Sequence, residues 1–403
     1  MPTIMKVTKE KCLATQENID ALVIGGHFQG LGVIRALARE GIRVALVDSE
    51  PCMARFSKDI ASYIHSPGVR NSAAFRDFLI EFARLHHLEG ALIYPTDDET
   101  VFFLSKNRDV LSDVYRIATP DWPVIRYAYN KRYSYQLADS MGIAIPRTAY
   151  PESIDDLASI DIPFPLIIKP AVMRNFFRVT GKKVFRAGNM DELLSAYRQA
   201  LKIIPADEIL IQEEIPDVSH HLFSFCPLFK NGRILAHIVA KRSRQHPMDF
   251  GQASTLAETL DIPELVEVGS RILSEMDYYG VCEVEFIQDP RDDKYKFLEI
   301  NPRIWGWHTL AVKAGVNLPY LLYQDMKGQS VLQTSFRKGV KWVRLTTDVP
   351  TVISEIMKGR MSPGDYIRSL RGEKTYAVLS RRDPLPFFGE FLLLPYLWRK
   401  RGF

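Results

Sequence analysis

The sequence predicts an α/β protein in which an N-terminal Rossmann-like domain is followed by a part of α+β character. The first observation is a βαβ pattern: an apolar strand from Ala21 to Gly25, a helix from Val33 to Glu40, and a second strand from Val44 to Asp48. The second is a later series of short strands that alternate apolar and polar residues. With 403 residues, the chain is long enough for two or three domains, each with its own core.

Composition and charge exclude several classes of protein. Apolar residues make up 46% of the chain, and 52 basic against 48 acidic side chains give a net charge of +4, too small to indicate nucleic-acid binding. The sequence has no run near the roughly 20 apolar residues of a membrane span, and its polar N-terminus lacks the apolar core of a signal peptide. Thiols in a reducing cytoplasm are expected, because the cysteines have no metal-ligand spacing: Cys12, Cys52, Cys226 and Cys282.

A glycine-rich turn joins the first strand to the first helix. Its glycines lie at positions 25, 26, 30 and 32, next to a helix N-terminus that favours an anion. Asp48, at the end of the second strand, lies where an acidic residue holds the ribose of a dinucleotide. The spacing does not fit G-x-G-x-x-G, so a dinucleotide-dependent oxidoreductase remains only an alternative.

Two later strands carry the most informative pattern. Val281 to Ile287 and Lys296 to Arg303 alternate apolar and polar residues, and Asp289 to Asp293 between them has the composition of a turn, so a hairpin is expected. Alternation places the polar side chains of each strand on one face: Glu283 and Glu285 on the first strand, and Glu299, Asn301 and Arg303 on the second.

A hairpin centred near Asp292 sets Glu285 opposite Glu299, and Glu283 near Asn301. Carboxylates crowded on one face of a sheet repel each other unless a cation lies there. Oxygen ligands of this kind suit Mg²⁺, usually shared with nucleotide phosphates. A solvated acidic strand face is the alternative interpretation.

These residues carry a resemblance to a known family. Glu285 and the string Leu298 to Arg303 resemble the metal-binding strands of the ATP-grasp superfamily, which includes biotin carboxylase and carbamoyl-phosphate synthetase. The longer string to His308 is similar to its carboxylate–amine ligase subgroup, of which D-aspartate ligase is a member. The resemblance covers about Ala21 to Gly328 and implies three parts: a Rossmann-like pre-ATP-grasp domain at 1–120, an ATP-grasp domain at 121–328 with a smaller lobe at about 148–215, and a C-terminal extension at 329–403.

The resemblance also implies the cofactors, ATP with Mg²⁺ or alternatively Mn²⁺. By this resemblance Glu285, Glu299 and Asn301 bind the metal, and Lys131 and Lys169 hold phosphates. The backbone of three hinge residues is expected to bind the adenine base: Glu213, Glu214 and Ile215.

The loop that should close over the phosphates departs from the family pattern. Residues 171–181 contain glycine only at position 181. Arg174 and Arg178 are therefore expected to grip phosphate with their side chains instead of a nest of backbone amides.

Further polar residues acquire roles only through the resemblance. Arg242 and Arg244, which precede the segment His246 to Gly251, are expected to neutralise the γ-phosphate and the substrate carboxylate, while Arg303 faces the acyl-phosphate. The alternative for this cluster is a solvated basic strand edge. In the first domain, the glycine turn is expected to border the substrate site. The acidic segment Thr96 to Glu99 either contacts the substrate or simply begins a helix.

The implied reaction is that of an ATP- and Mg²⁺-dependent ligase. A carboxylate is phosphorylated to an acyl-phosphate, an amine attacks it, and an amide, ADP and phosphate are formed. The expected partners are small-molecule carboxylates and amines, without nucleic acid. Bicarbonate or ammonia as a substrate, a non-catalytic nucleotide sensor, and the oxidoreductase are the alternatives.

The last stretch, Pro384 to Phe403, is the most apolar of the chain and ends in the basic run Arg399 to Arg401. Gly389 and Pro395 argue against one uninterrupted helix. One interpretation is a peripheral contact of a cytoplasmic protein with an anionic membrane. The other is a tail that covers an apolar groove or forms a subunit contact, for example in a homodimer.

Overall fold

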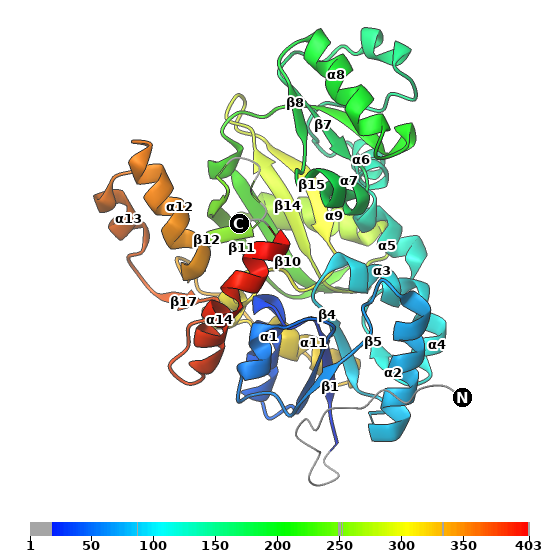
Figure 1. The fold of residues 1–403 in the computed structure, drawn as a ribbon, viewed down its shortest axis with the longest axis vertical. Coiled ribbons are helices and arrows are strands. Elements are labelled where there is room, and N and C mark those ends of the chain that lie inside the picture. Colours follow the sequence, from blue (N-terminus) through cyan, green and yellow to red (C-terminus); the bar gives the residue numbers. More distant parts are fainter. Residues whose placement is uncertain (1–17, 87, 249–250, 252, 333, 402–403) are drawn as a thin grey trace. The chain divides into compact units, whose positions relative to one another are not determined.

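The computed structural model describes residues 18–401 except 87, 249–250, 252 and 333, and it divides into two compact units (Figure 1). Unit 1 combines Met1–Thr119, Pro319–Val331 and Ala377–Phe403, and unit 2 combines Pro120–Leu318 and Leu332–Tyr376. The stretch 329–403, expected to be one extension, is thus shared between the units. Cys12 lies outside the described residues, whereas Cys52, Cys226 and Cys282 are free and buried.

Unit 1 is built on a five-stranded parallel sheet of order β3-β2-β1-β4-β5. The strand order changes direction at β1, as in doubly wound α/β sheets. Its strands are β1 (Ala21–Ile24), β2 (Val44–Asp48), β3 (Ser62–His65), β4 (Leu92–Pro95) and β5 (Arg116–Ile117). Its helices are α1 (Phe28–Ala38), η1 (Met53–Phe56), α2 (Ser72–His86), α3 (Asp98–Lys106), α4 (Arg108–Ser112) and α14 (Leu385–Arg401), with most of α11 (Leu318–Met326).

The glycine turn after β1 is explained by close packing. Gly25 has φ +96°, and a Cβ there would collide with the hydroxyl of Thr96. A Cβ at Gly30 would collide with the carbonyl oxygen of Gly25, so α1 approaches β1 closely. Asp48 accepts a hydrogen bond of 2.6 Å from the amide of Gly26. Its carboxylate therefore stabilises the turn, which argues against the ribose contact of the dinucleotide interpretation.

The acidic segment after β4 begins α3. Asp97 is the N-cap and accepts a hydrogen bond of 2.8 Å from the amide of Thr100. Thr96 donates its hydroxyl to the carbonyl of Ile24 at 2.8 Å. The helix-start interpretation of this segment is therefore confirmed for Asp97.

Unit 2 contains an eight-stranded sheet of order β15-β14-β10-β11-β12-β16-β17, with β13 paired to β10. Neighbours are antiparallel except β16 and β17. The turn from Lys230 to Arg233 joins β10 to β11, with positive φ at Asn231 and Gly232 as two-residue hairpins require. The strands are β10 (Leu222–Lys230), β11 (Arg233–His246), β12 (Ala253–Leu260), β13 (Gly280–Val281), β14 (Glu283–Gln288), β15 (Tyr295–Asn301), β16 (Lys341–Val343) and β17 (Lys374–Tyr376).

A second, four-stranded sheet of unit 2 has the order β6-β9-β7-β8. It comprises β6 (Thr148–Ala149), β7 (Leu166–Pro170), β8 (Phe185–Ala187) and β9 (Ile209–Glu213), with α7 (Met173–Thr180) and α8 (Met190–Leu201). The expectation of a loop at 171–181 is wrong, because most of this stretch is α7; the partly buried character that Phe176 and Phe177 suggested is confirmed for Phe176. Phe176 anchors the helix in the core of this lobe, and Gly181, at φ +64°, ends it.

Several further helices of unit 2 contact the eight-stranded sheet, among them α9 (Pro263–Glu275) and α12 (Leu345–Met357) (Figure 1). Helix α12 begins at Leu345 and contains Pro350. The further helices of unit 2 also include α5 (Trp122–Tyr129), α6 (Lys131–Ser140), η2 (Asp155–Ser159), η3 (Ala206–Glu208), η4 (Val218–His220), α10 (Thr309–Ala314) and α13 (Pro363–Ser369).

The apolar tail forms one continuous helix, α14, so the expected interruption at Gly389 and Pro395 is wrong. Gly389 lies against the ring of Phe56 in η1, which leaves no room for a Cβ, and this packing outweighs the poor helix propensity of glycine. Within the described part of the chain, no helix is both long and apolar enough to cross a membrane.

Candidate active site

The hairpin of β14 and β15 has the register that the sequence predicted. Glu285 lies opposite Glu299, and Glu283 lies opposite Asn301. Glu283 and Glu285 are 3% and 6% exposed, so the alternative of a solvated acidic strand face is wrong for these two carboxylates. The hairpin therefore concentrates negative charge in a buried place, which requires compensation.

Hydrogen bonds hold the acidic side chains in place. The Nδ2 atom of Asn301 donates to Glu283 Oε2 at 3.1 Å and to Glu285 Oε1 at 2.8 Å. From the neighbouring strand β10, Ser224 Oγ donates to Glu283 Oε1 at 2.9 Å. Burial and the nearby charge of Glu285 raise the pKa of Glu283 to about 8.

Two basic side chains compensate the other carboxylates. Arg242 of β11 pairs with Glu285, and Lys131, the first residue of α6, pairs with Glu299. Although burial opposes the shift, Lys131 and Lys183 lower the pKa of Glu299 to about 2. A lysine in the first turn of a helix is electrostatically unfavourable, and Glu299 supplies the partner that accounts for it.

Lys169 of β7 is held by neutral groups. Its Nζ atom donates to the hydroxyl of Tyr135 at 2.6 Å and to Gln212 Oε1 at 2.8 Å. Burial, reinforced by the positive charge of Lys131, lowers the pKa of Lys169 to about 7. This ammonium group is poorly compensated, so an anion beside it would be stabilised.

Lys183 belongs to this constellation, although sequence reasoning missed it. It lies between α7 and β8, and its Nζ atom donates to the carbonyl of Gly251 at 2.6 Å. Burial lowers its pKa, while the charges of Glu299 and Glu285 oppose that shift. The sequence did contain a signal for this residue: Lys182 and Lys183 directly follow Gly181, the glycine at the end of the expected phosphate loop.

Arg244 does not join Arg242 at this face. The register between β11 and β12 shifts between these two arginines, and a shift of one residue turns the following side chains to the other face. Arg244 forms a buried two-point ion pair with Asp348 of α12, at 2.9 Å and 3.0 Å. Its expected place beside the phosphate is thus corrected: here it connects β11 to α12.

The remaining arginines lie in different surroundings. Arg303 Nη2 donates to Asn301 Oδ1 at 3.3 Å, so Arg303 adjoins the carboxylate cluster. Arg174 lies on the first turn of α7 and is half-buried. Asp249 and Phe250, which belong to the segment expected to follow the basic cluster, lie outside the described residues.

The hinge from Glu213 to Ile215 already uses part of its backbone. The amide of Glu213 donates to the carbonyl of Arg147, and that of Glu214 donates to the carbonyl of Pro165. Ile215 packs in an apolar cluster with Leu222, Ile287, Val218 and Leu298.

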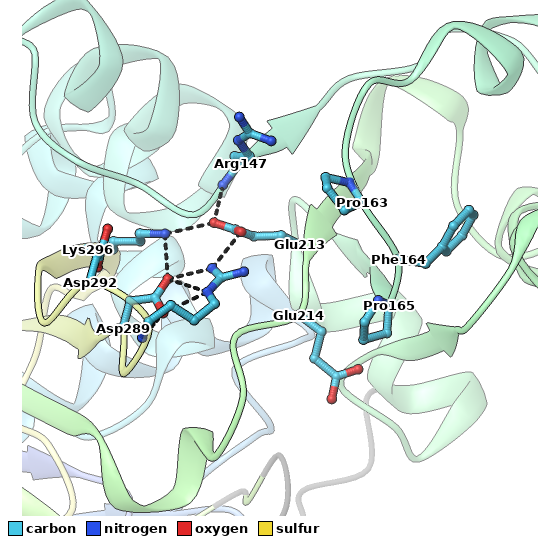
Figure 2. A pocket seen from close by; sticks show the side chains of 10 residues that line it. Arg147, Pro163, Phe164, Pro165, Glu213, Glu214, Asp289, Asp292 and Lys296 are labelled. Atoms are coloured by element: carbon cyan, nitrogen blue, oxygen red, sulfur yellow. Dashed lines mark hydrogen bonds and ion pairs between the residues drawn. The ribbon is translucent and has the colours of Figure 1, made fainter.

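The side chain of Glu213 faces a pocket of about 260 Å³ (Figure 2). It accepts hydrogen bonds from Lys296 Nζ at 2.9 Å and from Arg291 Nη2 at 2.7 Å. Lys296 also donates to Asp289 at 2.7 Å. This network connects the hinge to the turn between β14 and β15, so its charges serve to fix the two segments together.

The donor set fits Mg²⁺ only in company with phosphates. Among the described residues, no group of three or more His, Cys, Asp or Glu side chains is arranged as a ready metal site. Mg²⁺ usually takes one or two protein carboxylates and completes its shell with phosphate oxygens and water. Glu285 and Glu299, with Asn301 beside them, offer such a set, and Mn²⁺ accepts the same oxygen donors.

Comparisons with known proteins agree with this geometry. Residues 227–347 match the family described as "ATP-grasp in the biosynthetic pathway with Ter operon". The chain is 22% identical over 296 residues to the carbamoyl phosphate synthase large chain of Thermomicrobium roseum, covering 71% of this chain and 26% of that protein. The chain thus spans about a quarter of the length of this curated relative.

Two solved structures have the same fold. N5-carboxyaminoimidazole synthetase from Staphylococcus aureus superposes with a TM-score of 0.64 at 16% identity, covering 85% of this chain and 87% of that one. The biotin carboxylase domain of Hydrogenobacter thermophilus 2-oxoglutarate carboxylase, solved with MgADP, ADP and bicarbonate, gives 0.63 at 18% identity, covering 80% and 73%. These similarities establish a mixed α/β fold of the ATP-grasp type.

Proposed function

We propose, from the family match over residues 227–347 and the similarity to the carbamoyl phosphate synthase large chain, that the chain is an ATP-grasp enzyme: an ATP- and Mg²⁺-dependent ligase that joins a carboxylate to an amine. The γ-phosphate of ATP is transferred to the carboxylate oxygen, giving an acyl-phosphate and ADP. The amine nitrogen then attacks the acyl carbon, phosphate leaves, and an amide bond remains. The observation that carries this proposal is the register that places Glu285 and Glu299 side by side with Asn301.

Glu285, Glu299 and Asn301 would hold the metal, which supplies charge neutralisation at the phosphates when bound. The carboxylates of Glu285 and Glu299 are now paired with Arg242 and Lys131. With the metal bound, Arg242 and Lys131 would be available to pair with phosphate oxygens. Lys169 and Lys183 would add positive charge beside the negative charge of the metal–ATP complex.

Three lysines are assigned to the phosphates. Lys131, Lys169 and Lys183 come from α6, from β7 and from the segment after α7, and all three interact electrostatically with Glu299. Lys183 occupies the chain position just after the family's phosphate loop. It therefore takes the part that a backbone nest of glycines would otherwise play. Arg174, on the first turn of α7, is assigned to the same task.

The adenine base is assigned to the hinge. The amides of Glu213 and Glu214 are engaged within the protein, and Pro216 has no amide hydrogen. Ile215 is accordingly the proposed backbone donor, and its apolar cluster with Leu222 and Ile287 provides a surface for the flat ring.

Arg242 and Arg303 are assigned to the reacting groups. Both adjoin the acidic hairpin, so they are positioned to stabilise charge on the acyl-phosphate and on the tetrahedral intermediate that follows amine attack. No enzyme nucleophile is required. The proposed catalytic contribution is positioning and charge neutralisation.

A phosphate-release screen tests the proposal. The protein is incubated with ATP and Mg²⁺ and with pairs drawn from amino acids, sugar acids, bicarbonate and ammonia. A substrate pair that releases phosphate and yields a C–N product supports the function. Glu299→Gln should abolish that release, whereas Glu373→Gln, which removes the same charge at a surface ion pair, should not.

The alternatives give different results. Tight ATP binding without turnover on any pair would favour the nucleotide sensor, and flavin or nicotinamide absorbance in the purified protein would favour the oxidoreductase. Near wild-type release by Glu299→Gln would overturn the metal assignment.

A further inference from the structure

Helix α14 of unit 1 (Figure 1, red) has exposed apolar side chains and buried polar ones, the reverse of the usual amphipathic helix. The side that packs on the protein carries small or polar residues: Pro386, Gly389 and Glu390 are buried, and Tyr396 donates its hydroxyl to Glu50 at 3.2 Å. A helix that merely covered an apolar groove would turn its leucines and phenylalanines inward. Here Phe387 and Leu393 are half-buried, but the most exposed large apolar side chains are on the other side.

The outward side is an apolar stripe at helical spacing. Leu385, Phe388 and Leu392 are 59%, 62% and 75% exposed, and Phe391 between them is 48% exposed. Positions i, i+3 and i+7 share one face of a helix, so these side chains form one continuous surface. We call the four residues the α14 stripe. Exposing such a stripe to water is unfavourable, which indicates that it faces an apolar environment.

The charges around the α14 stripe are sorted by sign. Arg381 and Arg382 precede the helix and are exposed, as is Arg399 on its last turns. Arg55 and Lys58 are exposed in and just after η1, the element against which α14 packs.

The acidic residues of the same segment point inward. Asp383 is 2% exposed and bonded to Arg35, and Glu390 is 1% exposed. The surface around the stripe is therefore cationic and apolar together, which complements an anionic bilayer and repels a second copy of the same patch.

We propose that the α14 stripe lies in the interface of an anionic membrane, with the helix parallel to the bilayer plane. The leucine and phenylalanine side chains enter the boundary between headgroups and acyl chains, and the flanking arginines bind lipid phosphates. The protein is held peripherally, because the helix does not span. This inference is independent of the ligase proposal.

Flotation of the full-length protein with lipid vesicles tests this surface. The protein should bind vesicles of phosphatidylcholine mixed with phosphatidylglycerol, and not vesicles of phosphatidylcholine alone. Binding should weaken as salt rises, because the electrostatic part is screened. Binding to both kinds equally would contradict the role of the arginines.

Two matched pairs of variants separate the causes. Phe388→Ser with Leu392→Ser should weaken vesicle binding about tenfold or more. Met357→Ser with Ile367→Ser removes comparably exposed apolar side chains elsewhere and should leave it unchanged. These four positions are exposed, so thermal melting should be close to wild type.

The charge pair is designed in the same way. Arg381→Glu with Arg382→Glu should weaken binding about thirtyfold or more, since each basic residue near an anionic surface contributes roughly fivefold. Lys182→Glu with Lys202→Glu makes the same change in net charge outside the patch and should have a much smaller effect.

Sedimentation of the protein without vesicles tests whether a second copy of the chain, and not a membrane, covers the α14 stripe. If the wild type forms a dimer that Phe388→Ser with Leu392→Ser disrupts, and no vesicle binding is found, the stripe is a subunit contact and the membrane proposal is overturned. A monomer that does not float with anionic vesicles overturns it as well.

Discussion

At the scale of single residues, Lys169 carries a charge that its surroundings disfavour. Its two hydrogen-bond partners, Tyr135 and Gln212, are neutral, and burial lowers its pKa to about 7. Above that pH the amine of the ligand-free protein is mostly neutral. A phosphate placed beside it would favour the ammonium form and raise the pKa again.

Binding of ATP is therefore expected to take up a proton at weakly alkaline pH. The affinity for ATP should fall as the pH rises above about 7, because more binding energy is then spent on protonating Lys169. Calorimetric titration with a non-hydrolysable ATP analogue, in buffers that differ in ionisation enthalpy, measures the proton directly.

Lys169→Ala should abolish this proton uptake and weaken binding about tenfold or more, the value of one charge-assisted hydrogen bond. Lys202→Ala, at an exposed site just after α8, is the control and should change neither. Identical heats in all buffers at alkaline pH would remove Lys169 from the phosphate site.

At the scale of elements, a β-bulge decides what two neighbouring arginines do. Arg242 points to Glu285, whereas Arg244 points to Asp348, which is 0% exposed and also accepts a hydrogen bond of 2.8 Å from Thr255. Strict alternation along β11 would place both arginines on one face. The shift in register separates them into one residue of the site and one of the core.

The two arginines should consequently respond differently to substitution by methionine. Arg244→Met leaves the buried Asp348 without its cation and should lower the free energy of unfolding by about 3–5 kcal/mol. Arg242→Met leaves the buried Glu285 without its cation, so it should cost stability as well, and it should in addition depress substrate-dependent phosphate release strongly in the folded protein. Denaturant unfolding and phosphate release are measured on both variants. A stable Arg244→Met protein that lacks turnover would show that Arg244 acts in the site.

The hydrogen-bond network at the hinge predicts how the stability of the protein depends on pH in the acid range. Hydrogen bonds from Arg291 and Lys296 hold the pKa of Asp289 well below its usual range. A carboxyl whose pKa is lower in the folded than in the unfolded state stabilises the fold above the unfolded pKa. That contribution is lost as the pH falls toward the folded pKa.

The wild type should therefore lose stability as the pH falls below about 4, and Asp289→Asn should lose less over the same range, although it is less stable at neutral pH. Unfolding by urea across this pH range measures the difference. Asp292→Asn, at an exposed position of the same turn, is the matched control. Parallel pH profiles for wild type and Asp289→Asn would contradict the network's role.

Elements differ in how far the sequence determines them. The pairing of β14 and β15 at Glu283–Glu285 was predictable, because an aspartate-rich turn and alternation favour a register that buries Val284 and Ile300. The shift in register between Glu285 and Phe286 was not expected from alternation. Helix α7 was only partly predictable: the resemblance suggested a loop, whereas the pair Phe176 and Phe177 indicated a partly buried segment, and Phe176 is indeed in the core of this lobe. The bulge that turns Arg244 inward depends on Asp348, which lies 104 residues away.

At the scale of the whole molecule, unit 1 is assembled from three stretches that are distant in the chain. Period and propensity describe only neighbours in sequence, so the sequence indicated the parallel sheet but not what completes the unit. The last stretch, Ala377–Phe403, is attached to the first by Arg35. The guanidinium of Arg35 donates hydrogen bonds to Asp383 and to the carbonyl of Val378, more than 340 residues away. Burial lowers the pKa of this arginine, and Asp383 opposes that shift.

Asp383 should therefore be the residue that fastens the C-terminal stretch to unit 1. It accepts hydrogen bonds from Arg35 at 2.9 Å, from Ser57 at 2.7 Å and from the amide of Lys58 at 3.1 Å. Asp383→Ala leaves a buried guanidinium without its counter-charge, and the expected cost is about 3–5 kcal/mol. A chain truncated after Asp383 keeps this carboxylate and loses only the packing of α14, so it should be the more stable of the two.

Hydrogen exchange of the α1 amides reads out unit 1 by itself, with Asp77→Ala at an exposed site as the control. Protection of α1 that survives in Asp383→Ala but vanishes on truncation would assign the fastening to helix α14 instead.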